Sequence, residues 1–131
     1  MERNMQSTGR QPCPVRFGRA APTVSVRDVD RAVAFYTGVL GFSKVFENGD
    51  PVGFVILEKD AAELHLSLHK GHKPTVQNVA HLMVEDATAL YQHLEEHKVK
   101  IVKSMRDANF GLRCFVFADP DGNRIDVGQD L

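Results

Sequence analysis

An internal repeat constrains the fold of this chain more than any other feature of its sequence. Each copy of the repeat reads as one strand, one amphipathic helix and three further strands. In the first copy these elements fall at about 23–27, 28–41, 42–47, 52–58 and 62–68. In the second copy they fall at about 79–84, 86–97, 99–103, 112–118 and 124–128. One supersecondary unit used twice explains such a repeat, so the sequence predicts two βαβββ modules.

The helices are predicted from apolar spacing and from their first residues. In the first helix the apolar side chains fall at i, i+3, i+4, i+7 and i+8, which places them on one face. Asp28 and Asp86 hold equivalent places before the two helices, and an aspartate there can accept a hydrogen bond from the first turn. Gly41 is a typical stop after the first helix. The apolar residues of the first helix are Ala32, Phe35, Tyr36, Val39 and Leu40.

The strand at 62–68 has the cleanest alternation in the chain. Leu64, Leu66 and Leu68 share one face, and His65 and Ser67 share the other with Glu63. We expect the leucines to lie beneath a helix, together with Leu82 and Val84 of the second module. Phe54, Phe115 and Phe117 are assigned to the core rather than to a ligand wall.

These patterns predict an α+β fold in which the two βαβββ modules form a curled mixed sheet around a cleft, with the helices on the convex side. A small ligand would be expected in the cleft. Residues 1–20 read as a tail and residues 21–131 as a single domain, with modules at about 21–68 and 79–129 and a linker between them.

The composition excludes several classes of function. A formal net charge of −1 and 43% hydrophobic residues are typical of an ordinary soluble domain and give no sign of a nucleic-acid partner. No apolar run is long enough to span a membrane. Cys13 and Cys114 lie far apart and read as free thiols in a reducing compartment, which favours the cytoplasm.

Two motifs resemble those of a known family. The stretch Val26-Arg27-Asp28-Val29-Asp30-Arg31-Ala32, continuing to Phe42, is similar to the first-module signature of the glyoxalase / bleomycin-resistance / dioxygenase (vicinal oxygen chelate) superfamily. The run Asp119-Pro120-Asp121-Gly122-Asn123 resembles the closing hairpin of that superfamily. Phe110-Gly111 and the ending Ile125-Asp126-Val127-Gly128 look most like its bleomycin-resistance branch.

The resemblance implies where a divalent metal would bind in the enzymes of the superfamily. One ligand comes from the first strand and one from the last strand of each module. Counting back from the helix caps places the first-strand positions at Ala21 and Val79, which cannot bind a metal, and the last-strand positions at His65 and Asp126, which can. A shift of two residues along the strand at 79–84 would replace Val79 with His81, and His65, His81 and Asp126 would then form a set of three potential metal ligands.

We therefore predict a small-molecule binding protein of the bleomycin-resistance type, which sequesters a drug or metabolite in a cleft of a homodimer, without catalysis and without a cofactor. The alternative is a metal-dependent glyoxalase-like lyase, isomerase or ring-cleaving dioxygenase with one divalent metal ion. A sensor or accessory module is a third class. The predicted ligand-contacting residues are His65, Ser67, His81, Phe110, Arg113 and Asp126, and no catalytic or metal-binding residue is assigned.

Overall fold

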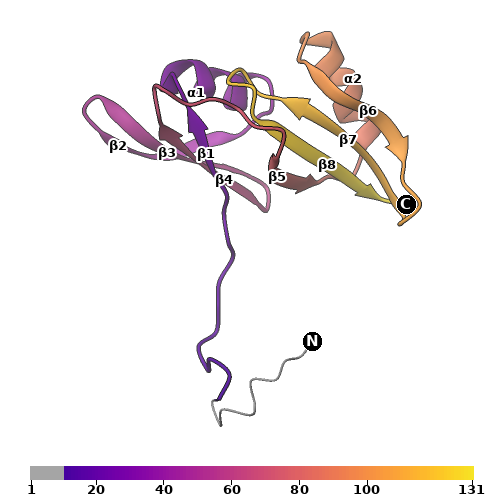
Figure 1. The fold of residues 1–131 in the computed structure, drawn as a ribbon, viewed down its shortest axis with the longest axis horizontal. Coiled ribbons are helices and arrows are strands. Elements are labelled where there is room, and N and C mark those ends of the chain that lie inside the picture. The colour runs from indigo at the N-terminus through magenta and orange to yellow at the C-terminus, as the bar shows by residue number, and fades with distance from the viewer. Residues whose placement is uncertain (1–10) are drawn as a thin grey trace.

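The computed structural model describes residues 11–131, and these contain the two predicted modules (Figure 1). The first module comprises β1 (Thr23–Val26), α1 (Val29–Gly38), β2 (Ser43–Gly49), β3 (Val52–Lys59) and β4 (Ala62–Leu68). The second comprises β5 (Asn78–Met83), α2 (Ala87–Glu96), β6 (Ile101–Asp107), β7 (Leu112–Ala118) and β8 (Arg124–Asp130). The α+β class and the repeated βαβββ order are confirmed.

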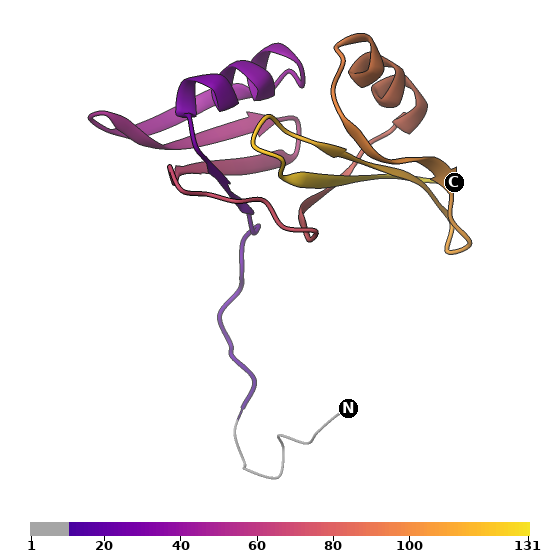
Figure 2. The same ribbon diagram turned by 45° about the horizontal axis from the view of Figure 1, so that its top comes forward.

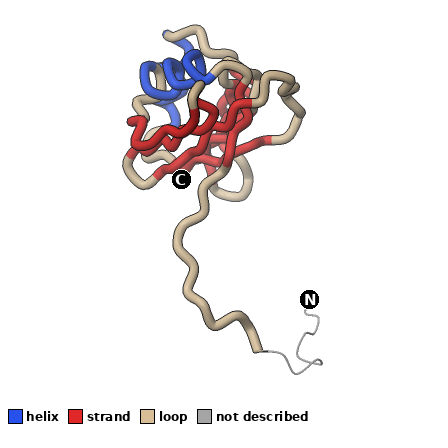
Figure 3. Tube along the Cα trace, turned by 90° about the vertical axis from the view of Figure 1, so that its left-hand side faces the viewer, coloured by secondary structure: helices blue, strands red, loops and turns tan. Residues whose placement is uncertain are grey.

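Each module forms its own four-stranded mixed sheet. The strand orders are β1-β4-β3-β2 and β5-β8-β7-β6, so both modules have the same topology. In each sheet the first and last strands of the module pair in parallel, and the remaining neighbours are antiparallel. Both helices lie on the same side of the sheets (Figures 2 and 3). The opposite faces, called here the open faces, carry no helix in the part of the chain that the structure describes.

The core lies between the sheets and the helices, where the strand alternation predicts it. Leu64 and Leu66 are buried, and Leu82 and Val84 pack against the core with part of their surface exposed. Because Leu66 is fully buried while its neighbour His65 is only half-buried, the predicted register of β4 is confirmed. The polar side chains of β4 therefore point to the open face.

Both predicted helix caps are confirmed. The Asp28 side chain accepts a hydrogen bond from the Arg31 N–H at 3.0 Å, and Asp86 accepts one from the Ala89 N–H at 2.9 Å. The second helix ends at Glu96 and is followed, after His97, by Lys98, whose φ of 58° lies in the left-handed region that favours glycine. The Val99 N–H still bonds to the Leu94 carbonyl, so β6 begins at Ile101 rather than at 99 and runs on to Asp107.

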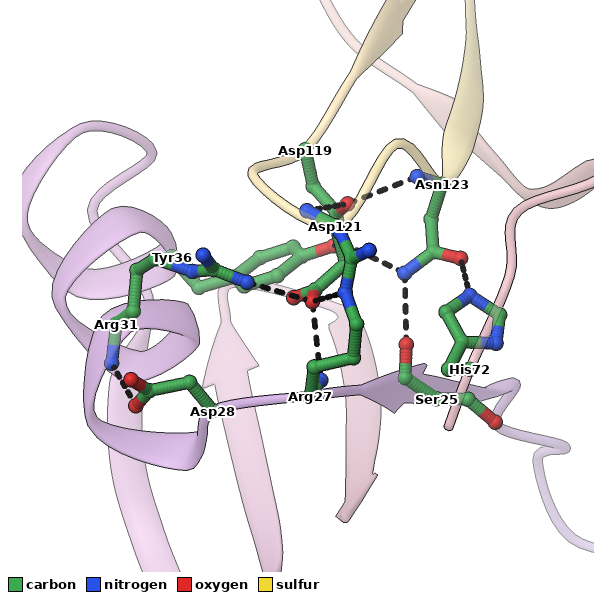
Figure 4. Close-up of polar contacts among 9 residues, drawn as sticks. All are labelled: Ser25, Arg27, Asp28, Arg31, Tyr36, His72, Asp119, Asp121 and Asn123. Atoms are coloured by element: carbon green, nitrogen blue, oxygen red, sulfur yellow. Dashed lines mark hydrogen bonds and ion pairs between the residues drawn. The ribbon is translucent and has the colours of Figure 1, made fainter. Parts of the chain in front are cut away.

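The β7–β8 turn fastens the second module to the first. The buried carboxylate of Asp119 accepts hydrogen bonds from the Tyr36 hydroxyl and from the backbone N–H groups of Asp121 and Asn123, at 2.8–2.9 Å (Figure 4). The Asn123 amide donates to the Ser25 carbonyl at 2.8 Å. We call the contacts of residues 119–123 with the first module the clasp.

At the tip of this turn, the buried carboxylate of Asp121 forms ion pairs with two arginines of the first module. Asp121 has no exposed side-chain surface, and its Oδ1 accepts from the Arg27 backbone N–H at 2.9 Å, from Arg27 Nε at 3.0 Å and from an Arg31 guanidinium nitrogen at 2.8 Å (Figure 4). Burial raises the pKa of Asp121, but the hydrogen bonds from Arg27 and the charges of both arginines more than offset this, so that its pKa lies below the usual value.

The clasp should therefore weaken in acid. A carboxyl group with a lower pKa in the folded state stabilises the fold above its unfolded pKa of about 3.9, and the contribution is lost as the pH falls through the folded pKa. Urea unfolding of the wild type and of Asp121→Asn is expected to show a stability difference at neutral pH that shrinks as the pH is lowered below about 4. A difference that stays constant over this range would contradict this assignment.

The predicted tail covers residues 1–20, of which 1–10 lie outside the described residues. Residues 11–20 are exposed and form no helix or strand, and they lead away from the modules (Figure 3). Arg19, at the end of this segment, forms ion pairs with Glu58 and Glu63 of the first sheet. No helix within residues 11–131 has the length and apolar character needed to cross a membrane.

Candidate functional site

The open face of the first sheet combines aromatic and acidic side chains around His65. The His65 ring meets Phe54 edge to face at a centroid distance of 5.3 Å, and Phe54 meets Phe46 in the same way at 6.3 Å. His65 Nε2 lies 2.6 Å from a carboxylate oxygen of Glu63. The hydrogen bond from His65 is the main cause that lowers the pKa of Glu63, and Arg19 adds to it. This face presents a flat apolar surface beside a fixed carboxylate.

The open face of the second sheet is built around His81 and Asp126. These residues are partners in the parallel pairing of β5 with β8, and His81 Nδ1 lies 2.6 Å from Asp126 Oδ2. His81 Nε2 lies 3.1 Å from the sulfur of Met83, which is 50% exposed. Gly128 makes this arrangement possible, since a Cβ there would lie 3.1 Å from the His81 ring and 3.2 Å from the Met83 sulfur.

The parallel strand pairs show which residues of β1 and β5 lie beside His65 and Asp126. The β1 residue beside His65 is Thr23, not Ala21, and the β5 residue beside Asp126 is His81, not Val79. In β5 the pairing has an irregularity between Asn78 and Ala80, which changes the position of Val79 relative to β8. In β5 the residue paired with Asp126 is therefore the one that a shift of two residues from Val79 would bring in.

The two histidines nevertheless do not meet in one chain. No hydrogen bond or ring contact joins His65 to His81 within residues 11–131, because each is held by partners in its own sheet. In the same part of the chain no three side chains of His, Cys, Asp or Glu gather closely enough to hold a metal ion. The residues of one chain as arranged here do not fit a mononuclear metal site, which normally needs three protein ligands.

The other residues predicted for the site lie in different places. Ser67 is half-buried in β4, where it is paired with Ser25 of β1 and Phe54 of β3. Phe110 is 66% exposed in the loop between β6 and β7. Among the described residues, no hydrogen bond or ring contact joins Ser67 or Phe110 to the pair formed by His81 and Asp126.

Arg113 is separated from the open face. Its guanidinium bonds to Asp107 at 2.8 Å and to the Thr88 hydroxyl of α2 at 3.3 Å, so it lies on the side of the sheet that carries the helix. The alternation of β7 points to the same side, because Arg113 has the parity of Phe115 and Phe117, which are in the core. Asp107 raises the pKa of Arg113, and Arg113 in turn lowers the pKa of Asp107.

Sequence reasoning missed one contributor to the open faces: Phe54, which was assigned to the core, packs on His65 instead. Met83 covers the free side of the His81 ring, on the face that the alternation of His81 and Met83 predicts. The alternation of β3 gives a signal for Phe54, because Val55 and Leu57 are the buried residues of that strand. Phe115 and Phe117 lie in the core as expected.

The sequence of residues 16–127 matches the family model described as Glyoxalase/Bleomycin resistance protein/Dioxygenase superfamily. The chain belongs to this superfamily. The match covers both modules of the structure, the helix caps and the clasp. No curated protein matches the sequence closely enough to count as a relative.

Solved structures show that the glyoxalase superfamily fold extends over nearly the whole chain. A bleomycin resistance determinant encoded on the transposon Tn5 has 24% identity and a TM-score of 0.74, with 87% of this chain and 98% of that chain covered. A superfamily member from Sphaerobacter thermophilus has 29% identity and a TM-score of 0.70, with 84% and 94% covered. The bleomycin-binding protein of Streptomyces verticillus, complexed with copper(II)-bleomycin, has 23% identity and a TM-score of 0.69, with 89% and 99% covered.

Proposed function

We propose that this superfamily member binds a small organic molecule on the open faces of its sheets, without catalysis, and sequesters a drug or metabolite in the manner of a bleomycin resistance protein. The observation that carries the proposal is the pair of open faces, which hold aromatic surface and fixed polar groups instead of a buried core. Solved structures with the same fold bind bleomycin, which supports a small-molecule ligand.

We propose further that the complete binding cleft belongs to a homodimer. Each open face exposes apolar side chains, among them Phe46 and Met83, each 50% exposed. A second copy facing these surfaces would bury them and would set the His65 face of one protomer opposite the His81 face of its partner. Light scattering should then give about twice the monomer mass of 14.6 kDa, and a monomer at micromolar concentration would oppose this arrangement.

Calorimetry with bleomycin tests the binding site, because structures of the same fold bind this compound. His65→Ala and Phe110→Ala are each expected to weaken binding by about 1–3 kcal/mol, because each removes one polar or stacking contact. His97→Ala is the matched control, since His97 is exposed at the end of α2 and its ring bonds only to the His93 carbonyl among described residues. Unchanged affinity in both site variants, or no binding by the wild type, would refute the proposed site.

One observation favours a metal-dependent enzyme as the second candidate. His81 lies beside Asp126 across β5 and β8, and His65 lies on the open face of the first sheet, so three side chains that can bind a metal occupy the open faces. A dimer that sets the two open faces against each other would bring these donors together. Metal analysis of protein purified without chelator separates the two proposals. Stoichiometric Zn, Ni, Mn or Fe would contradict binding without a metal and support the enzyme.

The protein is proposed to act in the cytoplasm. Both cysteines are free: Cys13 is exposed and Cys114 is buried in β7. Free thiols are typical of proteins kept in a reducing compartment.

A further inference from the structure

A cavity of about 430 Å³ lies beside the linker that joins the two modules. On one side it is bounded by Pro74 and Val76 of the linker, and on the other by the start of β6 and the clasp turn. Val102 and Ala118 add apolar surface, and Lys100 and Arg124 bring positive charge. Its size is within the range of small-ligand pockets.

The two cations in this cavity have no anionic partner among residues 11–131. Neither Lys100 nor Arg124 takes part in an ion pair there, whereas Arg19, Arg27 and Arg31 all do. One carboxylate, that of Asp119, lines the cavity, but its two oxygens already accept hydrogen bonds from Tyr36, from two backbone N–H groups and from the Asn123 amide. The cavity therefore offers positive charge that the described residues leave unpaired.

Other groups in the wall complement these charges. The Thr75 oxygen accepts a hydrogen bond from the Gln77 N–H at 3.1 Å, so the hydrogen of its hydroxyl remains available for a ligand. Val76 is 72% exposed, and together with Pro74 and Val102 it gives the cavity wall an apolar surface that a ligand could cover. An arginine fork and a lysine beside apolar surface match an anionic oxygen group attached to an apolar body.

We propose that this cavity binds a small molecule that carries a phosphate or carboxylate group on an apolar body. Arg124 would hold the anion through its paired N–H groups, Lys100 would supply a second charge, and the Thr75 hydroxyl would donate one hydrogen bond. Val76 and Val102 would contact the apolar part of the ligand.

The wall of this cavity is already fixed in place, which reduces the entropy lost on binding. Gly122 has a φ of +82°, and a Cβ at this position would lie 2.8 Å from Pro74 Cγ, so the linker and the clasp turn are in close contact. His72 Nε2 also lies 2.8 Å from Asn123 Oδ1, which ties the linker to the same turn (Figure 4). The linker wall, which carries Thr75 and Val76, therefore needs less ordering when a ligand binds than a loose loop would.

This inference does not depend on the proposed function. Arg124 shares the open face of β8 with Asp126, but the cavity uses neither His65 nor His81. Loss of bleomycin binding in the His65 variant would therefore leave the anion site unaffected, and the two sites can fail separately.

Phenyl phosphate is a suitable probe, and its binding can be measured by calorimetry and by the changes in amide chemical shifts in NMR. Saturable binding is expected, with shifts concentrated at residues 74–76, 100–102 and 118–124. Benzoate tests the carboxylate form of the ligand, and benzyl alcohol, which has the ring without the charge, is expected not to bind. Binding should weaken as salt is added, since charge interactions at a partly open site are screened.

Arg124→Gln and Lys100→Ala are each expected to weaken phenyl phosphate binding about tenfold, the loss typical of one charge-assisted contact. Arg106→Gln is the matched control, because Arg106 is exposed on β6, has the same charge and does not line the cavity. An equal loss in Arg124→Gln and Arg106→Gln would show attraction by overall charge and would overturn the site. Absence of binding, or shifts centred on residues 63–67 and 79–83, would also overturn it.

Discussion

Replacing Asp119 with alanine is expected to lower the free energy of unfolding by about 3–5 kcal/mol. The side chain is 5% exposed, and its two oxygens accept the Tyr36 hydroxyl, the backbone N–H groups of Asp121 and Asn123, and the Asn123 amide. Alanine would leave these buried donors without a partner, and each unsatisfied donor costs about 1–3 kcal/mol. The full sum is not expected, because water can enter a loosened turn.

Tyr36→Phe separates the contribution of one hydrogen bond from that of the whole turn. The Tyr36 hydroxyl is buried, and burial together with the neighbouring Asp119 charge holds its pKa well above the usual value, so it is protonated and donates at neutral pH. The phenylalanine variant is expected to lose about 1 kcal/mol in urea unfolding. If Asp119→Ala costs no more than Tyr36→Phe, the turn does not depend on Asp119 in the way proposed.

The clasp connects stability with the candidate site. It joins β1 and α1 of the first module to the turn between β7 and β8, so it holds the second module, with its open face, against the first. Loosening it should disturb ligand binding on the open faces and also at the linker cavity, because Asp119, Pro120 and Gly122 of the clasp turn line that cavity. Stability and binding should therefore fall together in clasp variants, whereas open-face variants should lose binding alone.

Local patterns in the sequence were sufficient to predict the elements of the fold. The alternation around Leu66 fixed the buried face of β4, and Asp28 and Asp86 marked the first turns of the helices, because these signals depend only on residues a few positions apart. The ends of β6 were less accurate, since they depend on the left-handed residue Lys98 and on pairing with β7.

The candidate site was predicted less completely, because it depends on pairing between distant strands. His81 lies beside Asp126 because β5 pairs in parallel with β8, and no local periodicity reveals a pairing between residues 45 positions apart. The position of Arg113, by contrast, could have been predicted from the sequence. Phe115 and Phe117 lie two and four residues after Arg113, so they share its face of β7, and both belong to the core. The contact between Arg27 and Asp121 joins residues 94 positions apart and is accessible only from the structure.

Replacing Phe117 with alanine is expected to destabilise the fold by about 3–5 kcal/mol and to loosen the junction of the two modules. Phe117 has no exposed surface, and its ring lies 6.3 Å from Phe115 in its own strand and 6.4 Å from Phe35 of the first module. The cavity left by the ring would remove contacts on both sides of this junction. Phe110→Ala deletes the same side chain where it is 66% exposed and should change stability little. If the two variants unfold at the same midpoint urea concentration, Phe117 does not hold the modules together.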